Sequence, residues 1–487
     1  MSLFNHSLWY CCSLALFLLA CNAATHNSTA VDESSSVGDP KDYIQPYEQN
    51  PAYWSYRGVP VLLLGGTDND NLYQSKDLVE QLDLLQSVGG NFVRNVMSYR
   101  DEGDLIPYLR DENGKYDLTQ WNPAYWEQFE HFLQLARDRD IIVQIELWDR
   151  FDYSQANWTN SPFNPVNNVN YTLEEIGLDE EYPEHPHKDL QPFFHTVPGM
   201  DGYQDKLDKL RSYQNALIQK MLSYSLNYGN VLYCMDNETS TPLLWGKYWS
   251  TIIRQAATEK AVPAYTTEMI DQFWRPGNCA NCEPFIQDAK HFNFLDISQV
   301  NSRNFGQTHW DSLRYIMQIR SNATLRPANT VKIYGGNNTN WGSGSNQDGV
   351  ERFCRNIFGG CAGVRHHRPL SGNGLNEKSQ ASIRAVRKLE EQLHFWEMSP
   401  RMELLNGREE NEAYLVGKAD DSAFAVYFPL GGTVNLKTGA AGSTYQVGWI
   451  SLETGRPEGD PIMMSGETDL TLTPPVNSGS FAYIIRQ

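Results

Sequence analysis

A chain of 487 residues exceeds the size of one ordinary compact domain, so we expect a large domain together with a smaller one or a tail. The formal net charge of −20 at pH 7 excludes a surface that attracts nucleic acid or anionic membrane. An anionic partner would need a local basic patch.

The N-terminus has the composition of an export signal. Asp32 is the first charged residue, and the apolar run 14–20 is too short to span a bilayer but suits a signal peptide. Residues 18–21 (LLAC) resemble the lipobox of bacterial lipoproteins, whose Cys is acylated, whereas residues 22–24 (NAA) offer an ordinary cleavage site. We therefore expect a signal peptide over 1–21. The protein would be periplasmic, an outer-membrane lipoprotein or extracellular, with membrane contact only through such a lipid anchor.

The next segments differ sharply in composition. Residues 22–40 are polar and rich in Ser and Thr, which predicts a flexible tether. From 41 to 398, apolar strand-like runs alternate with amphipathic helical stretches, a pattern typical of a parallel sheet covered by helices. Eight strand candidates occur, the number that a (β/α)8 TIM barrel needs. They are residues 60–66, 91–97, 141–148, 230–237, 263–269, 292–300, 330–336 and 360–367.

After Ser399-Pro400 the pattern changes to short alternating runs separated by turn residues. These runs predict a small antiparallel β-sandwich over residues 399–487. The expected fold class is therefore α/β, a (β/α)8 TIM barrel followed by a small antiparallel β-sandwich.

The cysteines beyond the signal segment are odd in number, so at least one is free or paired elsewhere: Cys234, Cys279, Cys282, Cys354 and Cys361. Cys279 and Cys282 lie in a Pro/Gly/Asn-rich loop with no second pair and no His at metal spacing. In an oxidising compartment this favours a loop-closing disulfide over a zinc half-site. We expect no catalytic metal and no cofactor.

The reacting groups of a (β/α)8 barrel lie at the carboxyl ends of its strands, so polar residues there carry more weight than others. In the third strand, Gln144 and Glu146 share one parity and are expected inside the barrel. A buried structural hydrogen bond explains this pair about equally well.

The fourth strand ends in Asn237-Glu238, where an apolar run stops at the expected mouth. An Asn-Glu pair in this place resembles the barrel superfamily of retaining glycoside hydrolases, in which the Glu is the general acid/base and the Asn binds the sugar 2-hydroxyl. The resemblance implies these roles for Glu238 and Asn237. Residues 89–94 (GGNFVR) similarly resemble the second-strand motif, whose Arg supports the nucleophile, and this implies the same role for Arg94.

Further motifs are similar to the apiosidase-like branch of that superfamily. They are residues 50–54 with 61–65 at its first strand, 358–363 at its eighth, and 425–427, 449–455 and 474–475 in its C-terminal sandwich. That sandwich carries a collagen-binding label, which admits a third interpretation as a matrix-protein adhesin. A small sandwich that follows a barrel is more often structural.

One departure from the superfamily concerns the nucleophile. A Glu is expected at the end of strand seven, but residues 334–341 contain no carboxylate, and an amide cannot form the covalent glycosyl intermediate. Three explanations remain open. Glu268 on strand five or Glu146 on strand three serves as nucleophile or as base; the substrate assists itself; or the site only binds sugar.

The expected mouth is rich in aromatic and basic residues. The insertion 149–203 holds many rings, which would stack on sugars or form a small core of the loop itself. Positive residues follow most strand ends, and they suggest an anionic polysaccharide unless nearby acids pair with them. These residues are Arg100, Arg150, Arg275, Arg303 and the cluster Arg365, His366, His367 and Arg368. The acids are Asp68, Asp70, Asp149, Asp152 and Asp271. Substrate contacts are expected at Arg94, Trp148, Asp149, Asn237, Asn337, Trp341, Arg365 and His366.

The sequence thus predicts a glycoside hydrolase that cleaves O-glycosidic bonds of a plant or algal polysaccharide, with Glu238 as general acid/base. The alternative is a non-catalytic carbohydrate-binding surface protein on a degenerate barrel. A second carboxylate within about 5–10 Å of Glu238 would separate the two. A polysaccharide or oligosaccharide is the expected partner, and nucleic acid is not.

Overall fold

The computed structural model describes residues 40–487 except 273, 275, 276, 278, 279, 338, 339, 439–441 and 466–468. The expected signal peptide and the tether up to residue 39 lie outside the described residues, as do Arg275 and Cys279. Within the described part of the chain, none of the helices is both long and apolar enough to span a bilayer.

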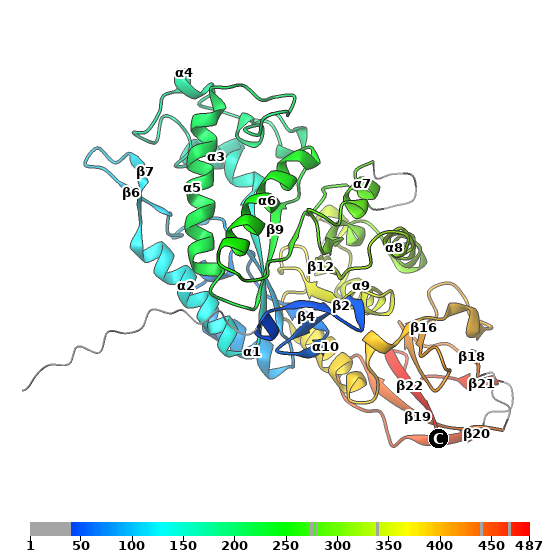
Figure 1. Ribbon diagram of the computed structural model, residues 1–487. Coiled ribbons are helices and arrows are strands. Elements are labelled where there is room, and N and C mark those ends of the chain that lie inside the picture. Colours follow the sequence, from blue (N-terminus) through cyan, green and yellow to red (C-terminus); the bar gives the residue numbers. More distant parts are fainter. Residues whose placement is uncertain are drawn as a thin grey trace, which may run out of the picture. The chain divides into compact units, whose positions relative to one another are not determined.

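Eight parallel strands form one sheet, in the order β10-β9-β8-β5-β4-β13-β12-β11. A parallel bridge between Met269 and Asp296 joins the two end strands and closes the sheet into a barrel. Each predicted run overlaps one strand of this sheet, so the predicted TIM barrel is confirmed (Figure 1). The strands are β4 (Leu63–Gly66), β5 (Phe92–Val96), β8 (Ile142–Asp149), β9 (Val231–Asn237), β10 (Thr266–Thr267), β11 (Leu295–Asp296), β12 (Ala328–Ile333) and β13 (Gly363–His366).

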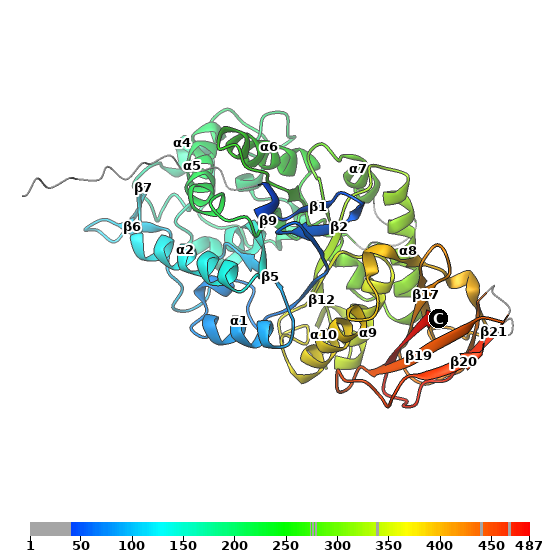
Figure 2. The ribbon, with the colours of Figure 1, turned by 60° about the horizontal axis from the view of Figure 1, so that its bottom comes forward.

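A helix follows each barrel strand, and these helices lie around the sheet (Figure 2). They are α1 (Leu78–Ser87), α2 (Pro123–Asp138), α5 (Leu207–Ser225), α6 (Leu243–Glu259), α7 (Cys282–Gln287), α8 (Gly306–Ser321), α9 (Asn346–Phe358) and α10 (Glu377–Glu390). Local sequence fixes where they begin. Asn122 caps α2, which has Pro at its first position, and Ser345 and Asp348 form a capping box at α9. Asp348, the first carboxylate after strand seven, is therefore a helix cap.

A small antiparallel sheet precedes the barrel: β1 (Gln45–Tyr47), β2 (Asn50–Tyr56) and β3 (Val59–Val61). The predicted first strand, 60–66, is thus split, because residues 59–61 pair with β2 and only Leu63–Gly66 joins the barrel. The Trp54 indole is fully buried and donates to Asn329 Oδ1 near the start of β12 at 2.9 Å. The β1–β3 sheet therefore packs at the amino ends of the barrel strands and does not cover their carboxyl ends.

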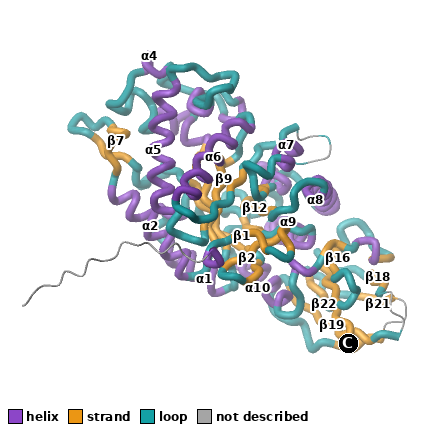
Figure 3. Tube along the Cα trace, in the orientation of Figure 1, coloured by secondary structure: helices purple, strands orange, loops and turns teal. Residues whose placement is uncertain are grey.

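The insertion after β8 is built from short helical turns (Figure 3). They are η3 (Arg150–Tyr153), α3 (Gln155–Asn160), α4 (Leu173–Ile176), η4 (Pro186–Lys188) and η5 (Pro192–Phe194). Most of its rings are buried and pack on one another and on the barrel core, and Tyr153 stacks on Phe193 at 3.9 Å between centroids. The hairpin β6 (Tyr108–Arg110) and β7 (Tyr116–Trp121) is attached to it by a bridge between Tyr116 and Asn168. Most of these aromatics are therefore structural, although the core that they join is that of the barrel and not a separate one.

Two antiparallel sheets make up the C-terminal region. The six-stranded sheet contains β14 (Ser399–Pro400), β16 (Tyr414–Gly417), β17 (Ala423–Phe428), β22 (Ser480–Arg486), β19 (Thr444–Ser451) and β20 (Ile462–Ser465). The three-stranded sheet contains β15 (Leu405–Asn406), β18 (Val434–Lys437) and β21 (Asp469–Leu472). Phe424 of the larger sheet and Leu436 of the smaller belong to one buried cluster. Phe481 stacks on Phe358 of α9 at 5.5 Å, so the larger sheet also packs on a barrel helix.

The remaining elements are single 3₁₀ turns: η1 (Pro40–Asp42), η2 (Leu72–Gln74), η6 (Ser298–Asn301), η7 (Asn340–Gly342), η8 (Phe395–Glu397) and η9 (Met402–Leu404). Cys282 is disulfide-bonded, while its predicted partner Cys279 lies outside the described residues. Cys234, Cys354 and Cys361 are buried free thiols.

Candidate active site

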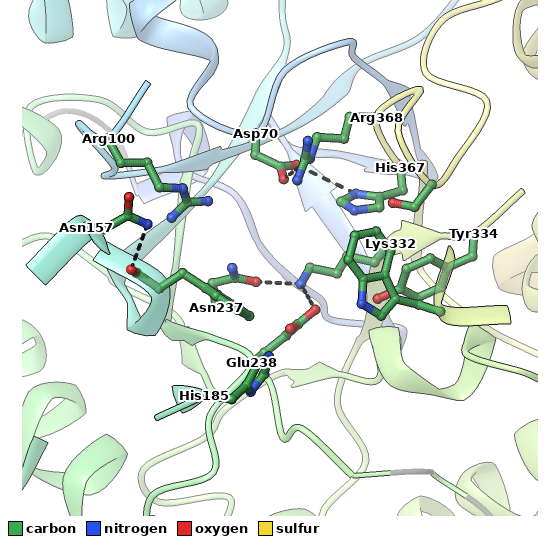
Figure 4. A pocket seen from close by; sticks show the side chains of 13 residues that line it. Asp70, Arg100, Asn157, His185, Asn237, Glu238, Lys332, Tyr334, His367 and Arg368 are labelled. Atoms are coloured by element: carbon green, nitrogen blue, oxygen red, sulfur yellow. Dashed lines mark hydrogen bonds and ion pairs between the residues drawn. The ribbon is translucent and has the colours of Figure 1, made fainter. Parts of the chain in front are cut away.

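An open pocket of about 270 Å³ lies at the carboxyl ends of the barrel strands, and we call it the central pocket (Figure 4). Its walls come from segments that follow β4, β5, β8, β9, β12 and β13. They comprise Asp70, Arg100, Phe151, Asn157, His185, Asn237, Glu238, Lys332, Tyr334, Trp341, His367, Arg368 and Ser371. Side chains from distant parts of the sequence therefore converge where the barrel fold places reactive groups.

Glu238 follows β9 directly and has a left-handed backbone, with φ of 61°. A non-glycine residue in this conformation costs about 1–2 kcal/mol, so the surrounding structure must hold it there. Its carboxylate forms an ion pair with Lys332 and accepts a hydrogen bond from Gln299 Nε2 at 3.1 Å. The side chain is 22% exposed, which leaves it accessible from the pocket.

Lys332 is the unexpected group of the site. It lies on β12, the strand on which the resemblance places the nucleophile, and its side chain is only 2% exposed. Its ammonium donates to Asn237 Oδ1 and to Glu238 Oε1, as Figure 4 shows. A cation, rather than a carboxylate, therefore reaches the pocket from strand seven.

Arg94 lies beneath the pocket, fully buried. It donates to both oxygens of Glu146 at 2.6 Å, to Asp70 Oδ1 at 2.5 Å and to Asn237 Oδ1 at 2.9 Å. Burial raises the pKa of Glu146 to about 7, against the opposing effect of Arg94. Glu146 thus belongs to an internal ion pair and does not line the central pocket.

Glu268, the other expected partner carboxylate, is also buried. Its Oε1 accepts from the backbone N–H groups of Asp236 at 3.1 Å and Met269 at 3.0 Å, and burial raises its pKa well above the usual value. Both oxygens are directed into the protein, since Oε2 lies against Gly246 of α6. Glu268 is placed to order the strand ends and not to meet a ligand.

A different carboxylate lines a pocket together with Glu238. Asp271, three residues beyond Glu268, lines a second hollow of about 410 Å³, the side pocket, which shares Glu238, Tyr334 and Trp341 with the central pocket. Burial, followed by the charge of Glu238, raises the pKa of Asp271 to about 7. Two carboxyl groups that influence each other therefore face one connected space.

Most of the basic residues at the mouth are paired with acids or with backbone. Arg100 contacts Asp149 and Asp152 at 2.5 Å each, Arg150 contacts Asp189 at 2.7 Å, and Arg368 contacts Asp70 at 2.6 Å. Arg365 is fully buried and donates to the Val331 carbonyl at 2.9 Å. Pairing with acids thus accounts for Arg100, Arg150 and Arg368, whereas Arg365 is held by backbone and hydroxyl oxygens.

The two adjacent histidines point apart. His366 is buried against α9 and α10, where it stacks on Phe353 at 4.4 Å and bonds Ser382 Oγ at 3.0 Å. His367 lines the central pocket with its Nδ1 3.6 Å from Asp70, and burial lowers its pKa well below the usual value. His367, not His366, is therefore the histidine of the site, and it is neutral.

The remaining expected contacts divide between pocket and core. Trp341 is 52% exposed and lines both pockets, and Asn237 lines the central one. Trp148 is buried among aromatic rings, 5.2 Å from Trp249, and Asp149 is sealed beneath Arg100. Asn337 accepts from the backbone N–H of Asn346 at 2.8 Å and lines neither pocket. Trp148, Asp149 and Asn337 therefore do not line the central pocket.

One group of potential metal ligands lies below the pocket. Among the described residues, Glu146, Cys234 and Asp296 have ligand atoms within 4.8 Å of one another, all buried. Arg94 already bonds Glu146, and Gln144 donates to Asp296 at 2.6 Å. Burial also raises the pKa of the Cys234 thiol well above its usual value, which opposes the thiolate that a metal would need. The arrangement is that of a hydrogen-bonded network.

Three comparisons bear on this site. The family model described as "Domain of unknown function (DUF6298)" matches residues 108–268, which contain the β6–β7 hairpin, β8, the insertion and β9. No curated protein matches the sequence. A glycoside hydrolase family 5 structure from Bacteroides vulgatus is similar with a TM-score of 0.60 at 12% identity, over 91% of this chain and 94% of that one. A structure titled "Glycoside hydrolase" is similar with a TM-score of 0.60 at 11% identity, over 91% of this chain and 97% of that one.

At such low identity the likeness shows the fold. The chain shares the (β/α)8 barrel fold of these two solved structures, and antiparallel sheets follow at its C-terminus. Its catalytic groups must be argued from its own residues.

Proposed function

We propose that this chain is a glycoside hydrolase that cleaves O-glycosidic bonds of a polysaccharide, with Glu238 and Asp271 as its two reacting carboxyl groups. One observation carries the proposal: Glu238, at the end of the fourth barrel strand, lies in the wall shared by two pockets, and Asp271 lines one of them. Glycoside hydrolysis needs one proton-bearing and one ionised carboxyl beside the bond that breaks.

The surroundings of the two acids suggest how the roles divide. The raised pKa of Asp271, about 7, lets it hold a proton near neutral pH, whereas Glu238 is ion-paired with Lys332. In this proposal Asp271 donates the proton to the leaving oxygen. Glu238 attacks the anomeric carbon or removes a proton from the attacking water. The role of proton donor, which the sequence resemblance implies for Glu238, then belongs to Asp271.

Neighbouring residues would support this chemistry without reacting. Lys332 bonds both Asn237 and Glu238, so it fixes the orientation of the carboxylate at the pocket wall. Arg94 holds Asn237 from below at 2.9 Å. Trp341 offers an exposed ring on which a sugar can stack at the junction of the two pockets. These are positioning and binding roles.

The substrate class remains part of the proposal. Because Arg100, Arg150 and Arg368 are ion-paired, we favour a neutral plant or algal polysaccharide over an anionic one.

Export, by a signal peptide or lipid anchor, rests on residues 1–21 alone. The likeness to the apiosidase-like branch rests on its short sequence motifs.

A second candidate, a barrel that binds sugar without cleaving it, is favoured by one observation. Lys332 brings a positive charge from the strand expected to carry the nucleophile. A cation there opposes the positive charge that develops on the sugar, unless Glu238 neutralises it.

The test screens wild type, Glu238→Gln and Asp271→Asn for released reducing sugar on galactomannan, xyloglucan, arabinogalactan, pectin and alginate. We expect wild type to release product from a neutral substrate and each variant to lose at least about a hundredfold in rate. Glu112→Gln, an exposed change on the β6–β7 hairpin outside the central and side pockets, is the matched control. Equal release by all four proteins would remove both acids from the mechanism. Binding without release by wild type would favour the second candidate.

A further inference from the structure

A third hollow, of about 490 Å³, adjoins the central pocket, and we call it the hairpin pocket. Three segments build it: the loop between β5 and β6, the β6–β7 hairpin, and the insertion after β8. Arg100 and Asn157 line both the hairpin pocket and the central pocket. The two hollows are therefore neighbours with a common wall.

The hairpin pocket and the side pocket each share lining residues with the central pocket, and they share none with each other. Figure 4 shows Arg100 and Asn157, which border the hairpin pocket, across the central pocket from Tyr334, which borders the side pocket. Glu238 lies between them and lines both the central and side pockets. A glycan long enough to occupy all three hollows would therefore place one of its inner sugar residues beside Glu238.

The lining of the hairpin pocket combines donors and acceptors with balanced charge. Arg110 and Lys115 bring positive charge, and Asp101 and Asp104 bring negative charge. The other polar side chains are Tyr99, Tyr116, Asn157, Asn160, Ser161 and Asn167, together with the paired Arg100 and Asp152. Sugar hydroxyls both donate and accept, so a neutral and hydroxyl-rich ligand matches this lining better than a charged one.

One of these groups is already held in place. Arg110 lies over the ring of Tyr116, with its guanidinium carbon 4.4 Å from the centroid, and donates to the Tyr116 hydroxyl at 2.6 Å. The guanidinium has five N–H donors, and the bonds to the Tyr116 hydroxyl and, weakly, to the Gly114 carbonyl use only some of them. The others can donate to a ligand. A pre-positioned side chain loses less entropy on binding.

We propose that the hairpin pocket binds sugar residues of a neutral glycan chain away from the bond that is cleaved. The inference rests on the proposed function. With the side pocket on the other side of Glu238, sugar residues are bound both before and after the reacting bond. The protein then cleaves inside polysaccharide chains and not from their ends.

The test measures kcat/KM on size-fractionated oligosaccharides prepared from the neutral polysaccharide that wild type cleaves. Arg110→Ala and Asn160→Ala remove exposed lining side chains, and Glu112→Ala changes an exposed residue of the same hairpin outside the lining. Wild type and Glu112→Ala should gain kcat/KM as the chain lengthens. Arg110→Ala should lose about tenfold on the longest chains and less than about twofold on the shortest. Loss that is equal at every length, or no loss, would overturn the inference.

Two further readouts separate this inference from the function on which it rests. Viscosity of galactomannan should fall faster, relative to released reducing ends, than with an enzyme that removes terminal sugars; the opposite result contradicts cleavage inside chains. If wild type cleaves nothing, the proposed function fails, and affinity electrophoresis on galactomannan tests the pocket alone. Retardation that Arg110→Ala weakens and Glu112→Ala preserves supports the site, and its absence overturns it.

Discussion

Glu146 and Glu238 lie near the same end of adjacent barrel strands, and each contacts a cation, yet their surroundings differ. Glu146 is fully buried on β8 with both oxygens bonded by Arg94. Glu238 lies one residue beyond β9, on a left-handed backbone, with its side chain partly exposed in two pocket walls. Glu146 is paired in register with Cys234, so Glu238 lies four residues closer to the carboxyl ends of the strands. This difference in depth places Glu146 inside the barrel and Glu238 at an open pocket.

Strand five repeats this contrast within four residues. Glu268 bonds backbone N–H groups inside the protein, whereas Asp271 lines the side pocket. In both comparisons the deeper carboxylate bonds groups inside the protein, and the shallower one lines a pocket.

The largest expected effect separates Glu146 from Glu238 by stability. Glu146→Ala removes both acceptors of the buried Arg94 guanidinium and leaves a buried space, so we expect a loss of about 3–5 kcal/mol in the free energy of unfolding at pH 8. Glu238→Ala should cost less, about 1–2 kcal/mol, because its side chain is partly exposed and the Lys332 ammonium keeps Asn237 Oδ1 as an acceptor. Urea denaturation of both variants at pH 8 measures the difference. Equal losses would show that depth does not distinguish the two acids.

The next effect concerns Asp271 and the pH dependence of stability. Its pKa rises from the usual 3.8 to about 7 in the folded protein, so the folded state binds this proton more tightly than the unfolded chain. Ionisation then costs the folded state stability as pH rises from about 4 to about 7. Asp271→Asn cannot ionise, so we expect it to be more stable than wild type by about 4 kcal/mol at pH 8 and nearly equally stable at pH 4.

Denaturation of wild type and Asp271→Asn across pH 4–8 checks this expectation. A difference that does not change with pH would mean that the carboxyl titrates near its ordinary pKa. The role of Asp271 as proton carrier would then be lost.

The smallest effect concerns sugar binding at the pocket junction. Trp341 is 52% exposed, so Trp341→Ala should change the free energy of unfolding by less than about 0.5 kcal/mol. Loss of its stacking surface should raise KM about tenfold. Ile462→Ala, which removes a side chain of a residue that is 53% exposed on β20, is the matched control for KM and stability. An unchanged KM in Trp341→Ala would remove the ring from the binding surface.

Sequence patterns are sufficient for the barrel because each apolar run overlaps one barrel strand, including β10 and β11, which have only two residues each. The placement of Glu238, Asn237 and Trp341 at the mouth also followed from their positions after strand ends. The split of the first predicted run was missed because Val61 pairs with Trp54 of β2, and a long-range pairing of this kind leaves no local mark.

The second carboxylate and the lysine could not be identified in the same way. In the sequence, Lys332 is a single charged residue within an apolar strand. Strands β12 and β9 are not neighbours in the sheet, so only the closure of the barrel brings Lys332 into contact with Glu238. From the sequence, Asp271 is expected only as a partner for an arginine, because its depth relative to Glu268 depends on where β10 ends. The arginines suggested an anionic ligand, and their pairing with Asp149, Asp152 and Asp70 emerges only in three dimensions.

The central claim is that Glu238 and Asp271 act together, with Asp271 giving the proton. Rates on aryl glycosides of the released sugar, with a good dinitrophenyl and a poor methoxyphenyl leaving group, test it most directly. Asp271→Asn should stay within about tenfold of wild type on the dinitrophenyl substrate and lose about a thousandfold on the methoxyphenyl one, while Glu238→Gln loses both. The reverse pattern, with Glu238→Gln rescued by the good leaving group, would contradict the account.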